Sequence, residues 1–349
     1  MTRILHLYRP RLPGQRAQAI QVVHAAHALA RRGADVTLLA DRSHPDATPR
    51  DALAALGLSP VDGLHIHLAP VVHKGAAGLW FRGALARWAL GAPGVVLARD
   101  LRRLVEARSW LSRHRVVIEV HGQDDHPFER RALELSSAVI ANCEGTAASW
   151  ERAYGDRLPG PIHVAHNGTA PHRHRSIRAP DGVVRTVGSL RPYKGWDTLL
   201  DAAAAGLDVP LELVGGGGTL DRTLPPGVTL RPPVAFPDVP DLLARSAALV
   251  LPLADNRFGR VLTSPLKLFD YLATPTPLVL PRLPTVERAL RAAKATDSEL
   301  FWYTAGHPAS LRSAIHAAVG APGRAPVLRS WDHRLDPLAP LFDLPATSS

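Results

Sequence analysis

The sequence predicts an α/β protein made of two doubly wound domains, each with its own parallel sheet. Its 349 residues are enough for two domains of ordinary size, and a hydrophobic content of 46% lets each half bury a core. Short apolar strands alternate with helical patterns in both halves, and the alternation restarts at Val183 after a polar segment. Strands that are separated by helices pair in parallel, which is the basis for this fold class.

We expect four parts along the chain. They are an N-terminal domain over 1–170, a linker over 171–181, a C-terminal domain over 182–325, and a tail over 326–349 that could be helical and pack back on the N-terminal domain. The linker is placed by residues 172–180, which include few apolar side chains and a proline.

The first half begins with a strand, a loop and a helix. An apolar run predicts a strand over 4–8, and apolar residues at helical spacing predict a helix over 17–32. Gly14 lies in the loop between them, where open sheets bind ligands, so it could let the backbone approach a ligand; an ordinary turn glycine is the alternative. The other elements expected in this half are strands over 36–40, 64–68, 94–98, 116–120 and 138–142, and helices over 74–90, 99–113 and 144–152.

The second half repeats the pattern. A β-branched run predicts a strand over 183–187, and a helix follows Gly195. Ser264 and Pro265 predict the N-cap and the first residue of another helix. The other elements expected here are strands over 211–214, 228–230, 248–252 and 278–280, helices over 238–245, 287–294 and 308–319, and a tail over 331–341 that could be helical.

The loop after the strand 183–187 is a candidate anion site. It contains Gly188, Ser189, Arg191 and Lys194, and a helix begins directly after it. Backbone N–H groups and a helix N-terminus favour an anion, and two cations strengthen that preference. A sugar-nucleotide diphosphate suits this arrangement, whereas a solvated basic turn is the alternative.

A second candidate anion site begins at Ser264 and Pro265, followed by Leu266 and Lys267. A lysine in the first turn of a helix adds charge to the positive end of the helix dipole. The chain has only four lysines, and two of them fall in these two segments. Asp270, farther along the helix, could accept hydrogen bonds from ribose hydroxyls.

Histidines raise the questions of catalysis and metal binding. His121 follows the strand 116–120, so it could accept a hydrogen bond, take up a proton or bind a phosphate, or it could simply cap the next loop. His65, His67 and His73 lie close together in the sequence. We expect no metal there, because strand alternation puts the first two on one face with no obvious third ligand.

Composition narrows the class of partner. A net charge of +10, from 41 basic and 31 acidic residues, favours an anionic partner. The basic residues are scattered and no nucleic-acid motif is present, so we expect no nucleic-acid partner. One cysteine, Cys143, excludes an internal disulfide. We find no apolar run of about 18 residues and no signal peptide, so we expect a cytoplasmic protein.

Residues 74–90 combine three aromatic residues with Arg82 and Arg87. This pattern fits a helix that touches an anionic membrane peripherally. The commoner alternative is a helix that faces the core and keeps its arginines in solvent.

Taken together, these segments resemble a GT-B glycosyltransferase of the family 4 type. The strongest parts of the resemblance are residues 187–195 with Leu199 and Leu200, and residues 264–273. The resemblance covers nearly the whole length, with weaker matches at residues 31–37, 119–122, 167–168 and 214–217. The resemblance implies two Rossmann-like domains that face a cleft, with the donor nucleotide on the second domain and the acceptor substrate on the first.

The resemblance also implies roles for single residues. Lys194 matches the family's diphosphate-binding lysine, and residues 264–267 match the loop and helix start that hold the phosphates. Asp270 matches a glutamate that usually meets the ribose. His121 matches a histidine near the transferred sugar.

Three positions depart from the family pattern. The usual diphosphate arginine falls at Ser189, for which Arg191 could compensate. The glutamate usually found near the sugar falls at Leu262. The paired glycines of the first loop are reduced to Gly14.

The leading hypothesis is a retaining, metal-independent glycosyltransferase that uses a nucleotide-diphosphate sugar as donor and needs no cofactor. The acceptor substrate would be a cell-envelope glycan or a lipid-linked saccharide, reached at the inner face of the membrane. One alternative is a sugar-nucleotide epimerase or phosphorylase of the same fold. The other is a catalytically degenerate member that binds a sugar or a partner protein.

Overall fold

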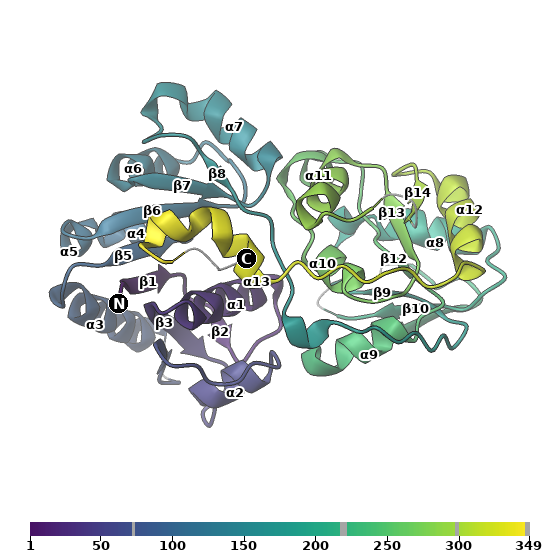
Figure 1. Ribbon diagram of the computed structural model, residues 1–349, viewed down its shortest axis with the longest axis horizontal. Coiled ribbons are helices and arrows are strands. Elements are labelled where there is room, and N and C mark those ends of the chain that lie inside the picture. Colours follow the sequence, from purple (N-terminus) through teal and green to yellow (C-terminus); the bar gives the residue numbers. More distant parts are fainter. Residues whose placement is uncertain (72–73, 217–221, 297–299, 346–349) are drawn as a thin grey trace. The chain divides into compact units, whose positions relative to one another are not determined.

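The chain folds around two parallel sheets, one in each of two units (Figure 1). The first unit comprises Met1–Ala165 and Trp331–Ser349, and the second comprises His166–Ser330. The computed structural model describes residues 1–71, 74–216, 222–296 and 300–345. The predicted two-domain α/β class is confirmed.

The first sheet is parallel throughout, and β1 lies inside it between β3 and β5. The order is β2-β3-β1-β5-β6-β7-β8, and β4 also pairs with β3. Its strands are β1 (Arg3–Leu7), β2 (Arg11–Leu12), β3 (Asp35–Arg42), β4 (Leu64–Ala69), β5 (Val95–Ala98), β6 (Arg115–Val120), β7 (Ala138–Ala141) and β8 (His163–Val164).

Helices cover both faces of this sheet. One core packs aromatic residues such as Trp88 and Trp150 against the apolar side chains of β1, β5, β6 and β7. On the other face α1 contacts α13, and the rings of His24 and Trp331 stack with centroids 5.6 Å apart. The helices of this unit are α1 (Ala17–Arg31), α2 (Pro49–Ala54), α3 (Lys74–Leu90), α4 (Leu101–Glu106), α5 (Arg108–Leu111), α6 (Pro127–Leu135), α7 (Glu144–Tyr154) and α13 (Trp331–Leu335).

The second sheet is also parallel, in the order β11-β10-β9-β12-β13-β14. Its central strands carry almost only buried residues, as expected when helices cover both faces. Its strands are β9 (Val184–Val187), β10 (Leu211–Val214), β11 (Val228–Arg231), β12 (Ala248–Val250), β13 (Leu278–Pro281) and β14 (Leu300–Tyr303). Its helices are α8 (Trp196–Ala204), α9 (Val239–Ala244), α10 (Leu266–Leu272), α11 (Pro284–Ala293) and α12 (Pro308–Val319).

Several elements differ from the sequence-based expectations. The helix expected over 99–113 is interrupted at Ala107, which separates α4 from α5. The short helix α6 and the edge strand β14 were not predicted. The segment expected as a linker, 171–181, belongs to the second unit, and its Arg173 is among the most buried side chains of the chain. Across the described ranges we find no helix with the length and hydropathy of a membrane span.

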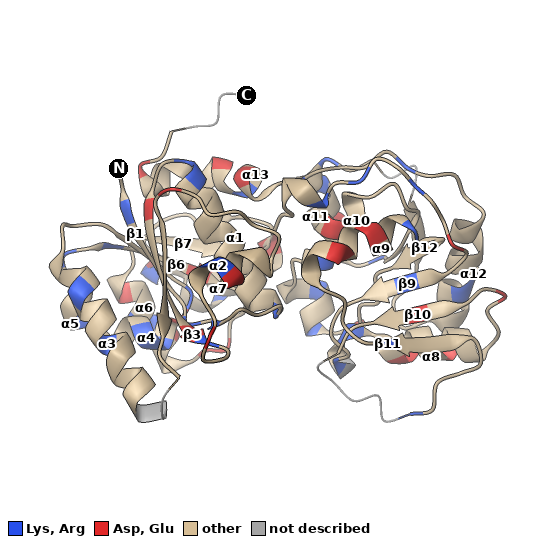
Figure 2. Cartoon of the chain, turned by 90° about the horizontal axis from the view of Figure 1, so that it is seen from below, with Lys and Arg blue, Asp and Glu red and all other residues tan. Residues whose placement is uncertain are grey.

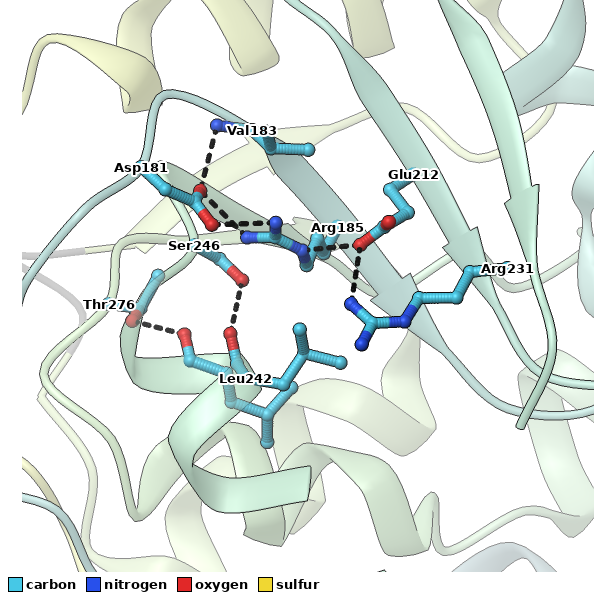
Figure 3. Close-up of polar contacts among 9 residues, drawn as sticks. Asp181, Val183, Arg185, Glu212, Arg231, Leu242, Ser246 and Thr276 are labelled. Carbon is cyan, nitrogen blue, oxygen red and sulfur yellow. Dashed lines mark hydrogen bonds and ion pairs between the residues drawn. The ribbon is translucent and has the colours of Figure 1, made fainter. Parts of the chain in front are cut away.

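A buried arginine network lies on the second sheet (Figure 3). Arg185 on the central strand β9 donates two hydrogen bonds of 2.7 and 2.8 Å to Asp181 and one of 2.7 Å to Glu212. Arg231 approaches the same glutamate at 3.7 Å but is far more exposed. Arg185 therefore joins the start of β9 to the neighbouring strand β10.

This network gives a stability prediction. The substitution Arg185→Met should lower the free energy of unfolding by about 3 kcal/mol, because it leaves two carboxylates without their buried partner. The matched control Arg231→Met removes an exposed cation and should cost less than about 1 kcal/mol. Urea unfolding of both variants measures the difference, and equal losses would contradict this account.

Candidate active site

Two loops of the second unit meet at the carboxyl ends of β9 and β12. The strand order reverses between these neighbouring strands, because β10 lies on the other side of β9. Gly195 in the first loop has φ +71°, and a Cβ there would come within 2.8 Å of the backbone carbon of Leu253 in the second loop. A side chain at position 195 would therefore separate the loops. Open α/β sheets bind ligands at such a switch point.

Lys194 points its ammonium group into the first loop. Its Nζ donates a 2.8 Å hydrogen bond to the Ser189 hydroxyl. Burial, and secondarily the charge of Arg191, lower the pKa of Lys194. The side chain of Arg191 itself is exposed. The predicted residues Ser189, Arg191 and Lys194 thus lie together in one loop.

Lys267 brings a second ammonium group to the same place from α10. Its Nζ would lie 3.2 Å from a Cβ on Gly188, and 5.5 Å from the centroid of the Trp196 ring. The nitrogen is shielded from solvent and has no hydrogen-bond partner among the described residues. Burial, followed by the charge of Lys194, lowers the pKa of Lys267 well below its usual value. Two lysines therefore share this site, and no described carboxylate neutralises Lys267.

The start of α10 differs from the prediction by one residue. Pro265 is the N-cap and Leu266 the first helical residue, so Ser264 does not cap the helix. The reason is that the Ser264 hydroxyl accepts a 3.0 Å hydrogen bond from the Asn167 backbone N–H and lies 3.3 Å from His166 Nδ1. Ser264, Pro265 and Leu266 nevertheless lie directly before Lys267.

Asp270, the predicted ribose contact, has protein partners in this structure. Arg173 donates hydrogen bonds of 2.8 and 3.0 Å to its two carboxylate oxygens, and the Thr169 hydroxyl donates one of 2.5 Å. Arg173 also bonds the Phe236 carbonyl oxygen and stacks on the Phe236 ring. Asp270 therefore holds residues 169–173 against α10, a contact that sequence reasoning missed because Arg173 was assigned to a linker. The carboxylate keeps some exposure, 18% of the side chain.

Leu262, which stands in place of the family's sugar-side glutamate, ends a π-helical turn, Phe258–Leu262. Its side chain is partly buried. It offers no charge or hydrogen bond from its side chain to a ligand.

A different polar cluster lies in the first unit, where Glu119 on β6 bonds side chains of α1 and α13. His121, just after β6, places Nε2 2.8 Å from Glu119 Oε1. The same oxygen accepts a 2.7 Å hydrogen bond from Arg334 and another from Gln21. Glu119 is 1% exposed and its charge is therefore balanced inside the protein. Sequence reasoning identified His121 but not Glu119, although a glutamate within an apolar strand was a usable signal.

Two more side chains complete this cluster. Arg99 bonds the Gln21 side chain and lies over the Tyr8 ring. His6 on β1 is fully buried, and both of its ring nitrogens are without a hydrogen-bond partner among the described residues.

The cluster fixes the protonation of its members. Burial alone would raise the pKa of Glu119, but Arg334, His121 and Arg99 outweigh burial and hold that pKa well below its usual value. Burial and Arg99 lower the pKa of His121 to about 4, despite the neighbouring glutamate. His121 is therefore neutral at pH 7. Since Nε2 donates its proton to Glu119, Nδ1 is left as a hydrogen-bond acceptor.

The remaining predicted residues are placed as follows. Gly14 forms part of a tight turn, and a Cβ there would lie 2.5 Å from the Arg11 carbonyl oxygen, which supports the turn alternative. His65 pairs with Asp35 at 3.0 Å on the surface. His73 lies outside the described residues, and within the described ranges no group of three metal-binding side chains occurs.

Helix α3 confirms the helical prediction for 74–90. Phe81, Leu85 and Trp88 pack into the core of the first unit. Leu79 and Leu90 are 69% and 81% exposed, and the helix carries arginines but no acidic residue (Figure 2). The buried residues fit the core-facing alternative, and the exposed leucines and arginines fit the membrane alternative.

Known families match most of the chain. The family model described as Glycosyltransferase Family 4 matches residues 18–173, and the one described as Glycosyl transferases group 1 matches residues 181–319. The alpha-maltose-1-phosphate synthase of Mycolicibacterium smegmatis is 29% identical over 237 residues, which are 62% of this chain and 54% of that protein. The chain thus spans about half the length of this curated relative.

Solved structures show the same fold. HepE of Anabaena, in complex with UDP and glucose, is 18% identical with a TM-score of 0.64 over 92% of this chain and 90% of that one. The catalytic domain of Starch Synthase IV from Arabidopsis thaliana, bound to ADP and acarbose, is 11% identical with a TM-score of 0.63 over 91% of each chain.

The protonation of the first cluster predicts acid sensitivity. The pKa of each imidazole falls from 6.5 in the unfolded state to about 4 in the folded state. Between pH 4 and pH 6.5 the imidazole therefore binds a proton only in the unfolded state. Stability is therefore fully present above pH 6.5 and is lost toward pH 4, by about 1.4 kcal/mol per pH unit for each of His6 and His121. Urea unfolding at pH 7, 6 and 5 measures this slope.

The variant His6→Phe isolates one of the two histidines. Its slope between pH 6.5 and pH 4 should be smaller than that of the unmodified protein by about 1.4 kcal/mol per pH unit, because one imidazole no longer binds a proton on unfolding. Identical slopes in both proteins would show that His6 is not the source.

Proposed function

The chain belongs to the GT-B glycosyltransferases of the family 4 type, and from that premise we propose that it transfers a sugar from a nucleotide-diphosphate sugar to a hydroxyl group, with retention of the anomeric configuration. The observation that carries the proposal is the pair Lys194 and Lys267, which brings two ammonium groups to one switch point. The solved relatives that hold UDP or ADP support a nucleotide donor.

The lysine pair suits a diphosphate for an electrostatic reason. Burying the Lys267 ammonium without a counter-charge is unfavourable, as its lowered pKa indicates. A diphosphate would supply that counter-charge and accept hydrogen bonds from both lysines. Lys267 would turn from the Trp196 ring toward a phosphate oxygen, and Ser189 and Ser264 would lie beside it as hydroxyl donors.

The same charges explain how the donor bond could break without a metal. When the sugar leaves, negative charge grows on the outgoing diphosphate, and fixed cations stabilise that charge most in the transition state. Lys194, Lys267 and the exposed Arg191 are the cations available. We therefore propose no metal and no cofactor for the reaction, so that a chelator should leave transfer unchanged.

The neutral state of His121 determines its role in this proposal. Because Nε2 donates to Glu119, Nδ1 is free to accept a hydrogen bond from a hydroxyl of the transferred sugar. A neutral histidine would orient the sugar rather than bind a phosphate. Asp270 would contact the ribose only through the part of its carboxylate that Arg173 and Thr169 leave accessible.

Two substitutions favour one alternative, a catalytically degenerate member of the family. Leu262 removes the sugar-side carboxylate of the family, and Ser189 removes an arginine. A degenerate member of the family would bind the nucleotide without turnover. Transfer or hydrolysis of a radiolabelled nucleotide sugar, followed by NMR of the anomeric product, separates this alternative from a retaining transferase.

The proposed acceptor substrate rests on the resemblance to the family and on the exposed residues of α3. We propose a cell-envelope glycan or lipid-linked saccharide, reached by a cytoplasmic protein at an anionic membrane surface. Exposed Leu79 and Leu90, together with Arg82 and Arg87, would make the membrane contact. Sedimentation with anionic and neutral vesicles tests this contact, which is excluded if neither kind of vesicle carries the protein down.

Nucleotide binding tests the donor site directly. We predict that one of UDP, GDP, ADP and TDP, at about 100 times its dissociation constant, adds about 2.7 kcal/mol to the folded state in a thermal unfolding assay. Lys194→Ala and Lys267→Met should each lose most of that stabilisation. Lys294→Met, which changes a lysine at the end of α11, is the matched control and should keep it. Stabilisation that survives in both site variants would place the nucleotide elsewhere.

A further inference from the structure

Arg334 is an unusual residue of the C-terminal tail because it reaches into the first sheet. It lies on α13 and is 1% exposed. Its terminal nitrogen lies 2.7 Å from Glu119 Oε1, and its guanidinium lies 6.0 Å from the Trp331 ring centroid. This arginine is the tail's direct contact with the polar cluster around His121.

Two hydrogen bonds connect the tail to the histidine. Arg334 donates to Glu119, Glu119 accepts from His121 Nε2, and both bonds use the same carboxylate oxygen. The second oxygen of Glu119 has no hydrogen-bond partner among the described residues. The charge of Glu119 is thus balanced mainly by Arg334, because His121 is neutral.

We propose that Arg334 is a positioning residue that fixes the charge and the tautomer of His121 through Glu119. This inference rests on the proposed role of His121 in sugar transfer, but the contacts themselves do not depend on it. In the absence of Arg334, the buried carboxylate would retain hydrogen bonds from Gln21 and His121, and of these two side chains only His121 can take up a proton. A proton would then be drawn to His121, both ring nitrogens would become donors, and Nδ1 could no longer accept a hydrogen bond from a sugar hydroxyl.

Anchoring of the tail does not explain this arginine. Arg31 and Arg32 on α1 already pair with Asp332 and Asp336 of the tail. Buried ion pairs add little to stability compared with apolar residues of similar size. The buried charge therefore needs a second purpose. Among the described partners of Glu119, His121 is the one with a place in the proposed chemistry.

The charged and titratable groups facing His121 come from four elements. They are His6 on β1, Arg99 after β5, Glu119 on β6 and Arg334 on α13. Glu119 favours the protonated imidazole, whereas burial and the two arginines oppose it. Removal of Arg334 therefore shifts this balance toward protonation.

The test measures the histidine itself. The full-length protein is labelled with ¹⁵N-histidine, and long-range ¹H–¹⁵N spectra report the tautomer and titration of His121, assigned by comparison with His121→Gln. We expect the unmodified protein to hold the Nε2–H tautomer through neutral pH. In Arg334→Met the titration midpoint should rise by about one pH unit or more. The variant Arg334→Lys, which keeps the charge on a shorter side chain, should show a smaller rise.

A matched control separates this effect from loosening of the tail. Arg115→Met removes a 2.8 Å contact with Asp343 of the tail without touching Glu119, and it should leave the His121 midpoint unchanged. If Arg334→Met does not fold, Arg334→Lys alone decides. An unchanged midpoint in the Arg334 variants, or an equal rise in Arg115→Met, would overturn the inference. Nucleotide binding by the second unit is measured separately, so failure of the proposed function would leave the NMR result interpretable.

Discussion

A parallel sheet covered by helices on both faces leaves little room for polar side chains except at the ends of its strands. Both sheets of this protein meet that constraint. Strands such as β5, β7 and β13 are fully buried, and the candidate chemistry lies at the carboxyl ends of β6, β9 and β12. In the second unit the strand order reverses between β9 and β12, and the two loops that follow these strands meet there. The position of the site thus follows from the topology.

The two units differ in whether a buried charged side chain has partners of opposite charge within the protein. In the first unit Glu119 is surrounded by Arg334, Arg99, Gln21 and His121, so its charge is balanced within the protein. In the second unit Lys267 lies near Lys194, and no described carboxylate bonds to it. The first arrangement sets the protonation of His121, which we propose to accept a hydrogen bond from an uncharged sugar hydroxyl. The second arrangement would be stabilised by a bound anion, which is why we propose it as the site of the donor diphosphate.

Much of the architecture was predictable from the sequence because it depends on local pattern. Apolar runs separated by helical spacing predicted β1, α1, β9 and α8, and the basic loop at Lys194 follows from the same pattern. The contacts of the segment 171–181 could not be predicted, because Arg173 looks like a solvent-exposed linker residue in the sequence and only the fold shows it paired with Asp270. Arg334 was equally hidden, since its partner Glu119 lies 215 residues away in the chain. Contacts of this range carry no local sequence signal.

The most direct test of the account is the proton balance of nucleotide binding. The pKa of Lys267 is lowered well below its usual value in the free protein, and a bound diphosphate would raise it. In a series of pH values that spans the interval between these two pKa values, binding should take up a proton and weaken as pH rises. Isothermal titration with the most stabilising nucleoside diphosphate, in two buffers of different ionisation enthalpy, measures this uptake. We expect uptake in the unmodified protein and its loss in Lys267→Met. Binding without proton uptake, or uptake that persists in the variant, would contradict the assignment of the diphosphate to this lysine.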